Sequence, residues 1–170
     1  MQNRRNFLAS SAAFTGLAAL GSFGGVGAGY AATESFEIMR TEAEWKALLT
    51  PAQFAILRRE KTERPFSNSL KGETSPLLTE NRAGTFHCAG CDLPVYMSET
   101  KFKSSTGWPS FWDVIDGNVL FKEDNTLFSR RTEEHCRRCG GHLGHVFDDG
   151  PEPTGKRHCI NGLAMTFKAA

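Results

Sequence analysis

Residues 135–150 read HCRRCGGHLGHVFDDG, in which a C-x-x-C pair leads into a short run of alternating polarity. A second pair lies upstream in HCAGC, residues 87–91. A C-x-x-C turn directs two thiolates toward one point, and two such turns can complete a tetrahedral zinc site. The sequence therefore predicts one structural Zn²⁺ per chain, with no coordination position left for water. The four predicted ligands are Cys88, Cys91, Cys136 and Cys139.

The paired cysteines also allow two other interpretations. They could form two disulfides in an oxidising compartment, or a single C-x-x-C pair could act in thiol–disulfide exchange. The presence of two such pairs in one chain favours zinc over both alternatives.

Short β-like runs separated by turn residues dominate the chain from residue 84 onward. We expect hairpin turns at residues 116–118 and at residues 124–125, where Asp, Asn and Gly cluster. The sequence therefore predicts a mainly β domain of antiparallel strands. The expected strands lie in GTFHC, LPVYM, SFWDVI, VLFKE, TLFSRR, HLGHVF and RHCINGLAMTF.

Two capping boxes precede the β-like region. Thr41 is followed three residues later by Glu44, and Thr50 by Gln53. Pro51 occupies the first helical position of the second segment, where its missing N–H has no cost. We expect two short helices at the start of the domain.

Composition and charge restrict the class of protein. The chain has 170 residues, of which 39% are hydrophobic and 23% charged, so it is long enough for one domain plus a leader and is not a disordered polymer. The formal net charge is +1. This balance gives no sign of a nucleic-acid partner or of binding to an anionic membrane.

The first 32 residues have the composition of an export signal. Arg4 and Arg5 precede a weakly apolar stretch rich in Gly and Ala. We expect a twin-arginine signal peptide at residues 1–32, cleaved to leave residues 33–170 as a periplasmic domain. The alternative is a membrane anchor, which the many glycines disfavour. We therefore expect no stable membrane insertion after cleavage.

The fifth cysteine, Cys159, lies in KRHCINGLAM, residues 156–165. If this segment is a strand, Arg157, Cys159 and Asn161 face one way, and His158 and Ile160 the other. A neighbouring cation and amide favour a reactive thiolate. The alternative is an unreactive cysteine in the core.

Three further side chains are candidates for a site around this cysteine. In an extended GGHLGHVF run, Leu143, His145 and Phe147 share a face, and His142 lies on the other unless a Gly bulge intervenes. Trp108, in the turn TGWPSFW, would expose a flat apolar surface. The alternatives are structural histidines beside the metal and a tryptophan that caps the core.

Together these motifs resemble the type B methionine sulfoxide reductases, the methionine-R-sulfoxide reductases. The similarity runs from EAEWKALLTPAQF through TGWPSFW and CGGHLGHVFDDGPEPTGKRHCINGLAM, and covers nearly all of residues 33–170. It implies a compact domain of two antiparallel sheets with a distal structural zinc. It also implies reduction of methionine-R-sulfoxide in proteins or peptides through a sulfenic acid on the nucleophile.

The resemblance assigns a role to each candidate residue. Cys159 is the nucleophile, and Trp108 contacts the methyl group of the substrate, with Phe147 as a second substrate contact. His145 and Asn161 hold and polarise the sulfoxide. His142 and Arg157 line the same site and support the thiolate.

The chain departs from the pattern of this family at two places. Many relatives carry a resolving cysteine just before GWPSF, whereas this chain has Ser104, Ser105 and Thr106. A one-cysteine enzyme needs an external thiol reductant, either a thioredoxin-like protein or a small thiol. The second departure is His158, where relatives commonly have an aromatic residue; we expect it to face away from Cys159 and to change the packing.

Two other functions remain open at this point. A zinc-ribbon-like protein-binding module would bury Cys159 and use Trp108 as a peptide contact. A cysteine hydrolase would pair Cys159 with His142 or His145 and need an oxyanion hole, for which the sequence has no clear signature. Nothing in the sequence argues against a monomer, which is the expected state.

Overall fold

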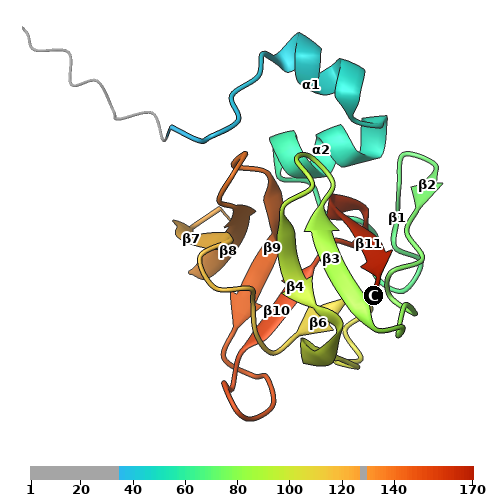
Figure 1. The fold of residues 1–170 in the computed structure, drawn as a ribbon, viewed down its shortest axis with the longest axis vertical. Coiled ribbons are helices and arrows are strands. Elements are labelled where there is room, and N and C mark those ends of the chain that lie inside the picture. Colours follow the sequence, from blue (N-terminus) through green and yellow to red (C-terminus); the bar gives the residue numbers. More distant parts are fainter. Residues whose placement is uncertain (1–34, 127–129) are drawn as a thin grey trace, which may run out of the picture. The chain divides into compact units, whose positions relative to one another are not determined.

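The computed structural model describes residues 35–126 and 130–170, so the expected signal peptide lies outside the described residues. Two α-helices precede a series of antiparallel strands (Figure 1). The helices are α1 (Glu42–Leu48) and α2 (Pro51–Arg59), with short 3₁₀ helices η1 (Ser98–Thr100) and η2 (Gly162–Ala164). The strands are β1 (Ser69–Leu70), β2 (Glu73–Thr74), β3 (Gly84–Cys88), β4 (Pro94–Met97), β5 (Lys101–Phe102), β6 (Ser110–Phe111), β7 (Val119–Asp124), β8 (Arg131–Cys136), β9 (His142–Phe147), β10 (Arg157–Ile160) and β11 (Met165–Ala169).

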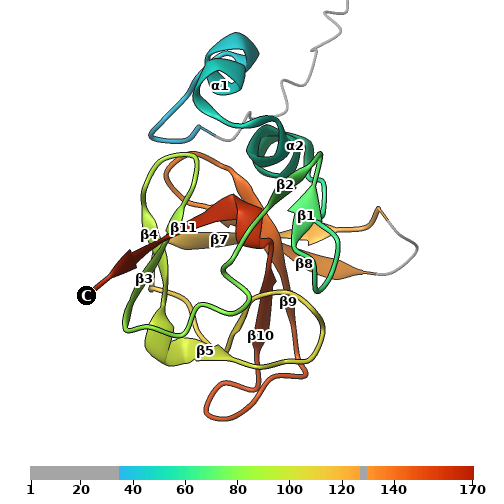
Figure 2. The same cartoon turned by 90° about the vertical axis from the view of Figure 1, so that its right-hand side faces the viewer.

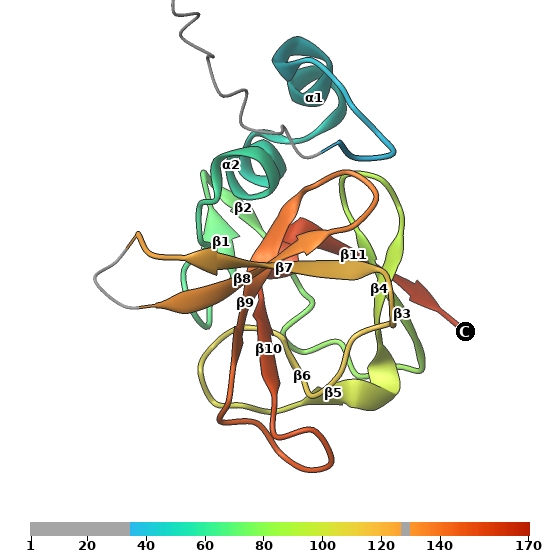
Figure 3. The same cartoon turned by 90° about the vertical axis from the view of Figure 1, so that its left-hand side faces the viewer.

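The strands form two main sheets and one small hairpin. The larger sheet has the order β5-β6-β10-β9-β8-β7, and Figure 3 shows β7, β8, β9 and β10 within it. The smaller sheet has the order β11-β3-β4, and β1 pairs with β2 alone. All of the strand pairs are antiparallel. The prediction of a mainly β domain with two antiparallel sheets and short N-terminal helices is confirmed.

Both predicted capping boxes form. The Thr41 side chain accepts a hydrogen bond from the Glu44 N–H, and Glu44 accepts one from the Thr41 N–H. Thr50 and Gln53 make the same reciprocal pair at the start of α2. These bonds satisfy N–H groups that have no partner within the helix.

The core lies between the two main sheets. Phe86 of β3, Tyr96 of β4 and Phe111 of β6 are fully buried. The rings of Tyr96 and Phe111 are stacked with centroids 4.4 Å apart, and Phe86 meets Phe111 edge-on at 4.9 Å. These aromatic contacts join the sheets, and α2 buries Ile56 and Leu57 in the same core.

Two details of the predicted strands are wrong. Residues 116–118 form a turn, but it leads from β6 to β7, which are not neighbours in the sheet, so it is not a hairpin turn. The run RHCINGLAMTF is interrupted by η2 and supplies β10 to the larger sheet and β11 to the smaller. By contrast, residues 124–125 do begin the connection of the β7–β8 hairpin. Within the described residues, no helix is both long and apolar enough to span a membrane.

Candidate active site

The four paired cysteines converge at one point. Their sulfur atoms all lie within 4.8 Å of one another. The Sγ atoms of Cys88 and Cys139 are 3.7 Å apart, and those of Cys91 and Cys136 are 3.4 Å apart. Four thiolates at Zn–S distances of about 2.3 Å in a tetrahedron would lie about 3.8 Å from each other. The donor set and its spacing therefore fit Zn²⁺, and none of the five cysteines is in a disulfide.

Backbone geometry holds the second cysteine turn in place. The Gly140 N–H donates to the Cys136 carbonyl, and Gly140 has a φ of 65°. A Cβ at Gly140 would lie 2.3 Å from the ring of Phe36, so only glycine fits this turn. Arg58 of α2 donates to the Cys139 carbonyl at 2.9 Å. Helix α2 therefore holds the second cysteine turn from outside the β region.

Contacts among the four sulfur atoms shift their pKa values in opposite directions. Contact with the thiols of Cys136 and Cys139 raises the pKa of Cys88 well above its ordinary value, whereas contact with Cys139 and Cys88 lowers the pKa of Cys136. A divalent cation would favour the ionised form of all four, because it stabilises thiolates directly. The cluster is thus suited to hold a metal.

The strand β10 brings Cys159 to a second, separate site. Cys159 pairs with His145 of β9 on one side and with Ser110 of β6 on the other. A Cβ at Gly144 would lie 2.1 Å from the Cys159 carbonyl oxygen, so glycine allows the close approach of β9 and β10. A cleft of about 120 Å³ opens at this place. It is lined by Thr62, Trp108, Arg131, Gly144, His145, Phe147, Cys159 and Asn161.

Two opposite influences act on the Cys159 thiol. Burial raises its pKa, whereas the Thr106 hydroxyl and Arg157 lower it, which leaves the pKa above its ordinary value. The Thr106 Oγ1 lies 3.8 Å from the Cys159 sulfur. Arg157 also forms two hydrogen bonds to Asp149, at 2.8 and 2.9 Å, and lies over the Phe147 ring. Arg157 thus acts on the thiol in the predicted direction, while the burial of the sulfur opposes it.

A β-bulge brings the two histidines together. Glu134 of β8 lies opposite Gly144, and the next residue lies opposite His142, which leaves Leu143 unpaired. Leu143 turns into the core and is fully buried. The rings of His142 and His145 then lie 5.4 Å apart. The prediction that Leu143 shares the face of His145 is wrong, and the bulge named as the exception is present.

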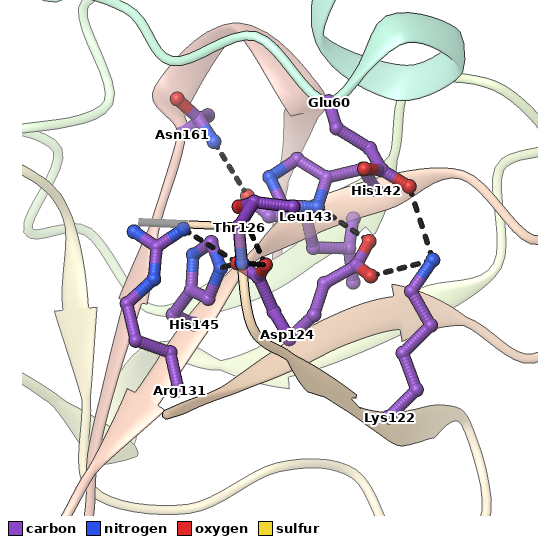
Figure 4. Close-up of polar contacts among 10 residues, drawn as sticks. Glu60, Lys122, Asp124, Thr126, Arg131, His142, Leu143, His145 and Asn161 are labelled. Carbon is purple, nitrogen blue, oxygen red and sulfur yellow. Dashed lines mark hydrogen bonds and ion pairs between the residues drawn. The ribbon is translucent and has the colours of Figure 1, made fainter. Parts of the chain in front are cut away.

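His145 is held by Asp124 at the end of β7 (Figure 4). Its Nε2 lies 2.7 Å from the Asp124 carboxylate, which also accepts hydrogen bonds from Thr126 and Arg131. Burial lowers the pKa of His145, although the hydrogen bond to Asp124 opposes the shift. His145 is therefore neutral near pH 7, with Asp124 accepting the Nε2 proton.

His142 also contacts a carboxylate, and it is more deeply buried than His145. Its Nδ1 lies 2.6 Å from Glu133, which also forms an ion pair of 2.7 Å with Lys122. Burial lowers the pKa of His142 to about 4. Among the described residues, the Nε2 of His142 has no hydrogen-bond partner. A carboxylate of the same sheet therefore holds each histidine, as Figure 4 shows for His145 and Asp124.

Asn161 and Trp108 are fixed by the loop before β1. The Asn161 side chain accepts from the Glu63 N–H at 3.0 Å and donates to the Leu143 carbonyl at 2.9 Å. Since a primary amide carries two N–H groups, one donor of Asn161 remains for a ligand. The Trp108 indole N–H donates to the Glu63 carbonyl at 3.1 Å. The tryptophan is half-buried and lines the cleft rather than simply covering the core.

Most of the predicted site residues meet in this cleft. Trp108, His145, Phe147, Cys159 and Asn161 line it. The other two, His142 and Arg157, lie behind it and contact residues that do.

Sequence reasoning missed the carboxylates that orient the site. Asp124 and Glu133 hold the two histidines, and the buried side chain of Glu63 accepts from the N–H groups of Gly162 and Leu163. Only the pairing of distant segments reveals these roles. The one sequence signal that could have indicated these carboxylates was an acidic residue inside an otherwise β-like run.

His158 faces away from the cleft, as expected. It is 5% exposed, and its Nδ1 lies 3.0 Å from the buried carboxylate of Glu134. The Tyr96 hydroxyl donates to the same carboxylate at 2.8 Å. The polar residue at this position is thus accommodated by a buried hydrogen-bonded group behind β10.

Comparison with known proteins agrees with this geometry. The family described as the SelR domain matches residues 49–169. The peptide methionine sulfoxide reductase MsrB of Methanosarcina barkeri is 49% identical over 132 residues, which cover 77% of this chain and 88% of that protein.

Two further relatives show the same similarity in distant organisms. The corresponding protein of Agrobacterium fabrum is 45% identical over 133 residues, covering 78% of this chain and 93% of the relative. The chloroplastic reductase B1 of Arabidopsis thaliana is 45% identical over 130 residues, covering 76% of this chain and 61% of the relative. With the cysteine cluster and the cleft around Cys159, these matches show that the chain belongs to the SelR family of methionine-R-sulfoxide reductases.

Proposed function

We propose that the reduction of methionine-R-sulfoxide by this chain takes place at Cys159, with His145 as the proton carrier. The observation that carries the proposal is the pairing of Cys159 with His145 on adjacent strands, in a cleft that Trp108 also lines. A sulfoxide has an electrophilic sulfur and a basic oxygen. Its reduction needs a sulfur nucleophile, a proton for the oxygen and an apolar wall for the methyl group.

The first step transfers oxygen from the substrate to the enzyme. The Cys159 sulfur attacks the sulfoxide sulfur, and its proton passes through the neutral His145 to the sulfoxide oxygen. The sulfur–oxygen bond of the substrate breaks and methionine leaves. Cys159 carries the oxygen as a sulfenic acid, so the enzyme is oxidised by two electrons and the substrate is reduced by two.

The neighbouring residues orient the reacting groups. Trp108 and Phe147 provide the apolar surface that receives the substrate methyl group, and the remaining N–H of Asn161 donates to the sulfoxide oxygen. Asp124 fixes the ring of His145. His142 and Arg157 act as positioning residues through their ring contacts with His145 and Phe147.

Recycling of the sulfenic acid requires an external thiol. The loop before Trp108 has Ser104, Ser105 and Thr106 in place of a resolving cysteine, and the Thr106 Oγ1 lies 3.8 Å from the Cys159 sulfur. The other four cysteines belong to the cluster. A thioredoxin-like protein or a small thiol therefore supplies two thiols, and the products are a disulfide, water and the restored Cys159 thiol.

Zn²⁺ held by Cys88, Cys91, Cys136 and Cys139 would have a structural role, because four protein thiolates leave it no open position. We also propose that residues 1–32 direct export by the twin-arginine route and are then removed. The enzyme would act as a periplasmic monomer that repairs oxidised envelope proteins. N-terminal sequencing of the periplasmic fraction tests this proposal, and a mature chain that still begins at Met1 would contradict it.

The reaction itself is tested with separated epimers. The mature protein is incubated with the R or the S epimer of a methionine-sulfoxide peptide and dithiothreitol, beside Cys159→Ser. We expect turnover of the R epimer only, and its loss in the variant. Reduction by Cys159→Ser at the wild-type rate would rule out the proposed nucleophile. Absence of turnover by zinc-loaded wild-type protein would favour the binding-module interpretation instead.

A further inference from the structure

A second and larger cavity shares Trp108 with the catalytic cleft. Its volume is about 450 Å³, compared with about 120 Å³ for the cleft. Apolar side chains form much of its lining, namely Phe66, Leu78, Phe102, Trp108 and Pro109. Polar residues, among them Lys103, Ser104 and Ser105, contribute the rest of the lining. Nothing in the proposed reaction uses this cavity.

Three segments that are distant in the sequence form the cavity, and hydrogen bonds hold them together. The Phe66 N–H donates to the Gly107 carbonyl at 2.8 Å, and the Lys101 ammonium donates to the Leu78 carbonyl at 2.9 Å. A Cβ at Gly107 would lie 2.7 Å from the Phe66 nitrogen, so glycine is needed for this contact. The cavity is therefore formed before any ligand binds. Figure 2 shows β5, which precedes the loop to Trp108, in the part of the molecule that also contains β10.

Phe66 is the most unusual residue of this lining. Its side chain is 69% exposed, the highest exposure among the large apolar residues of the described chain. Its φ is 65°, a left-handed conformation that aromatic residues rarely adopt. Conformational strain and an exposed ring are both unfavourable without a ligand, and such features concentrate at binding sites.

We infer that this cavity binds an apolar side chain next to the methionine sulfoxide in a protein or peptide substrate. The inference rests on the proposed function, because a methionine within a chain has neighbours that must leave the catalytic cleft. Successive residues of an extended peptide are about 3.3 Å apart, so a neighbouring side chain can reach a cavity that borders on the same tryptophan. Its apolar lining selects an aliphatic or aromatic side chain over a charged one.

This preference defines a class of substrate. Methionines flanked by large apolar residues are mostly buried in folded proteins and become accessible in unfolded or flexible segments.

The test compares capped tripeptides that contain methionine-R-sulfoxide in the central position. In the reference peptide both neighbours are Gly, and in the others one Gly is replaced by Phe on either side. We expect one of the Phe peptides to have a kcat/KM about tenfold higher than the reference, mainly through a lower KM. The kcat/KM for the better Phe peptide is divided by the kcat/KM for the Gly reference peptide, and this ratio is compared among variants.

Two variants change the cavity in opposite ways. Phe66→Ala removes part of its lining, and Thr79→Trp fills it from an exposed position whose side chain bonds only to the Pro76 carbonyl in the described structure. Both are expected to reduce the ratio toward one. Leu48→Ala removes an exposed apolar residue of α1, 54% exposed and away from the cavity, and is the matched control that keeps the ratio.

The outcomes separate this inference from the proposed function. If the wild type reduces the Gly peptide but shows no gain with Phe on either side, the inference is wrong and the proposed function stands. The same holds if both variants keep the gain, or if they raise the KM of the thiol reductant instead, because the cavity would then receive the reductant. If the wild type reduces none of the peptides, both are wrong.

Discussion

The chain uses cysteine in two environments that differ in what surrounds the sulfur. In the cluster, each sulfur has three others within 4.8 Å. In the cleft, Cys159 has no second thiol beside it among the described residues, and the Thr106 hydroxyl lies 3.8 Å from its sulfur. The cluster therefore suits a cation and resists oxidation once it is filled, whereas the cleft suits a substrate. The number of neighbouring thiols, rather than the residue type, separates the structural role from the catalytic one.

Loss of a cluster cysteine should have the largest effect. Replacing Cys136 with Ser should abolish zinc binding and unfold the domain, because structural zinc can contribute about 10 kcal/mol or more to folding. Circular dichroism on heating and zinc analysis measure the effect. Cys159→Ser is the control and should keep both the fold and one zinc per chain. A folded, zinc-free Cys136→Ser protein would contradict the structural role of the cluster.

Neutralising the Asp124 carboxylate that contacts His145 should have the second-largest effect. Asp124→Asn should lower kcat/KM for the R epimer by about a hundredfold, since the amide no longer fixes the imidazole in the required orientation and tautomer. Zinc content should not change. Glu123→Gln, at a 51% exposed carboxylate one residue earlier, is the matched control. Equal losses in the two variants would show that general electrostatics, and not the Asp124–His145 contact, is responsible.

The state of the Cys159 thiol can be read from its alkylation by iodoacetamide. Burial raises the pKa of this thiol, so at neutral pH little thiolate exists in the free enzyme. The rate should rise nearly tenfold per pH unit above neutrality, with a midpoint above the value of about 8.5 for an unperturbed thiol. Zinc-loaded Cys159→Ser gives the background. A midpoint below that value would show that the influence of Arg157 and Asn161 on the thiol outweighs the effect of burial.

The smallest effect on initial turnover is expected when a second cysteine is introduced beside Cys159. Thr106→Cys should keep the initial turnover but trap Cys159 in a disulfide, because the substituted position already lies next to it. After one turnover without reductant, the titratable thiols of the variant should be two fewer than before. Ser67→Cys, in an exposed loop, is the control. Persistence of a sulfenic acid in the variant would show that the Thr106 loop cannot deliver a resolving thiol.

Local spacing was enough to predict the cysteines and the helix caps. A C-x-x-C pair or a capping box is a property of neighbouring residues, so the sequence displays it directly. The partners of the active-site groups are different, because Asp124 meets His145 only through the pairing of three strands. No local pattern could supply that contact.

The differences between prediction and structure at Leu143 and Arg157 also arise from contacts between distant segments. The sequence pattern placed Leu143 beside His145, and the bulge between β8 and β9 moved it into the core. Arg157 lowers the pKa of the Cys159 thiol in the expected direction, but its guanidinium is also bound by Asp149 from the loop after β9, a partner that the sequence did not predict. Strand register and a competing partner, both set by tertiary structure, decided these two positions.

A single turnover without reductant tests the central claim most directly. Zinc-loaded protein is mixed with excess R-sulfoxide peptide and dimedone, which traps sulfenic acids, and the products are analysed by mass spectrometry. We predict one methionine formed per chain, one dimedone adduct on Cys159, and full retention of zinc. An adduct on a cluster cysteine, or zinc release in step with methionine formation, would contradict the division of the cysteines into structural and catalytic groups.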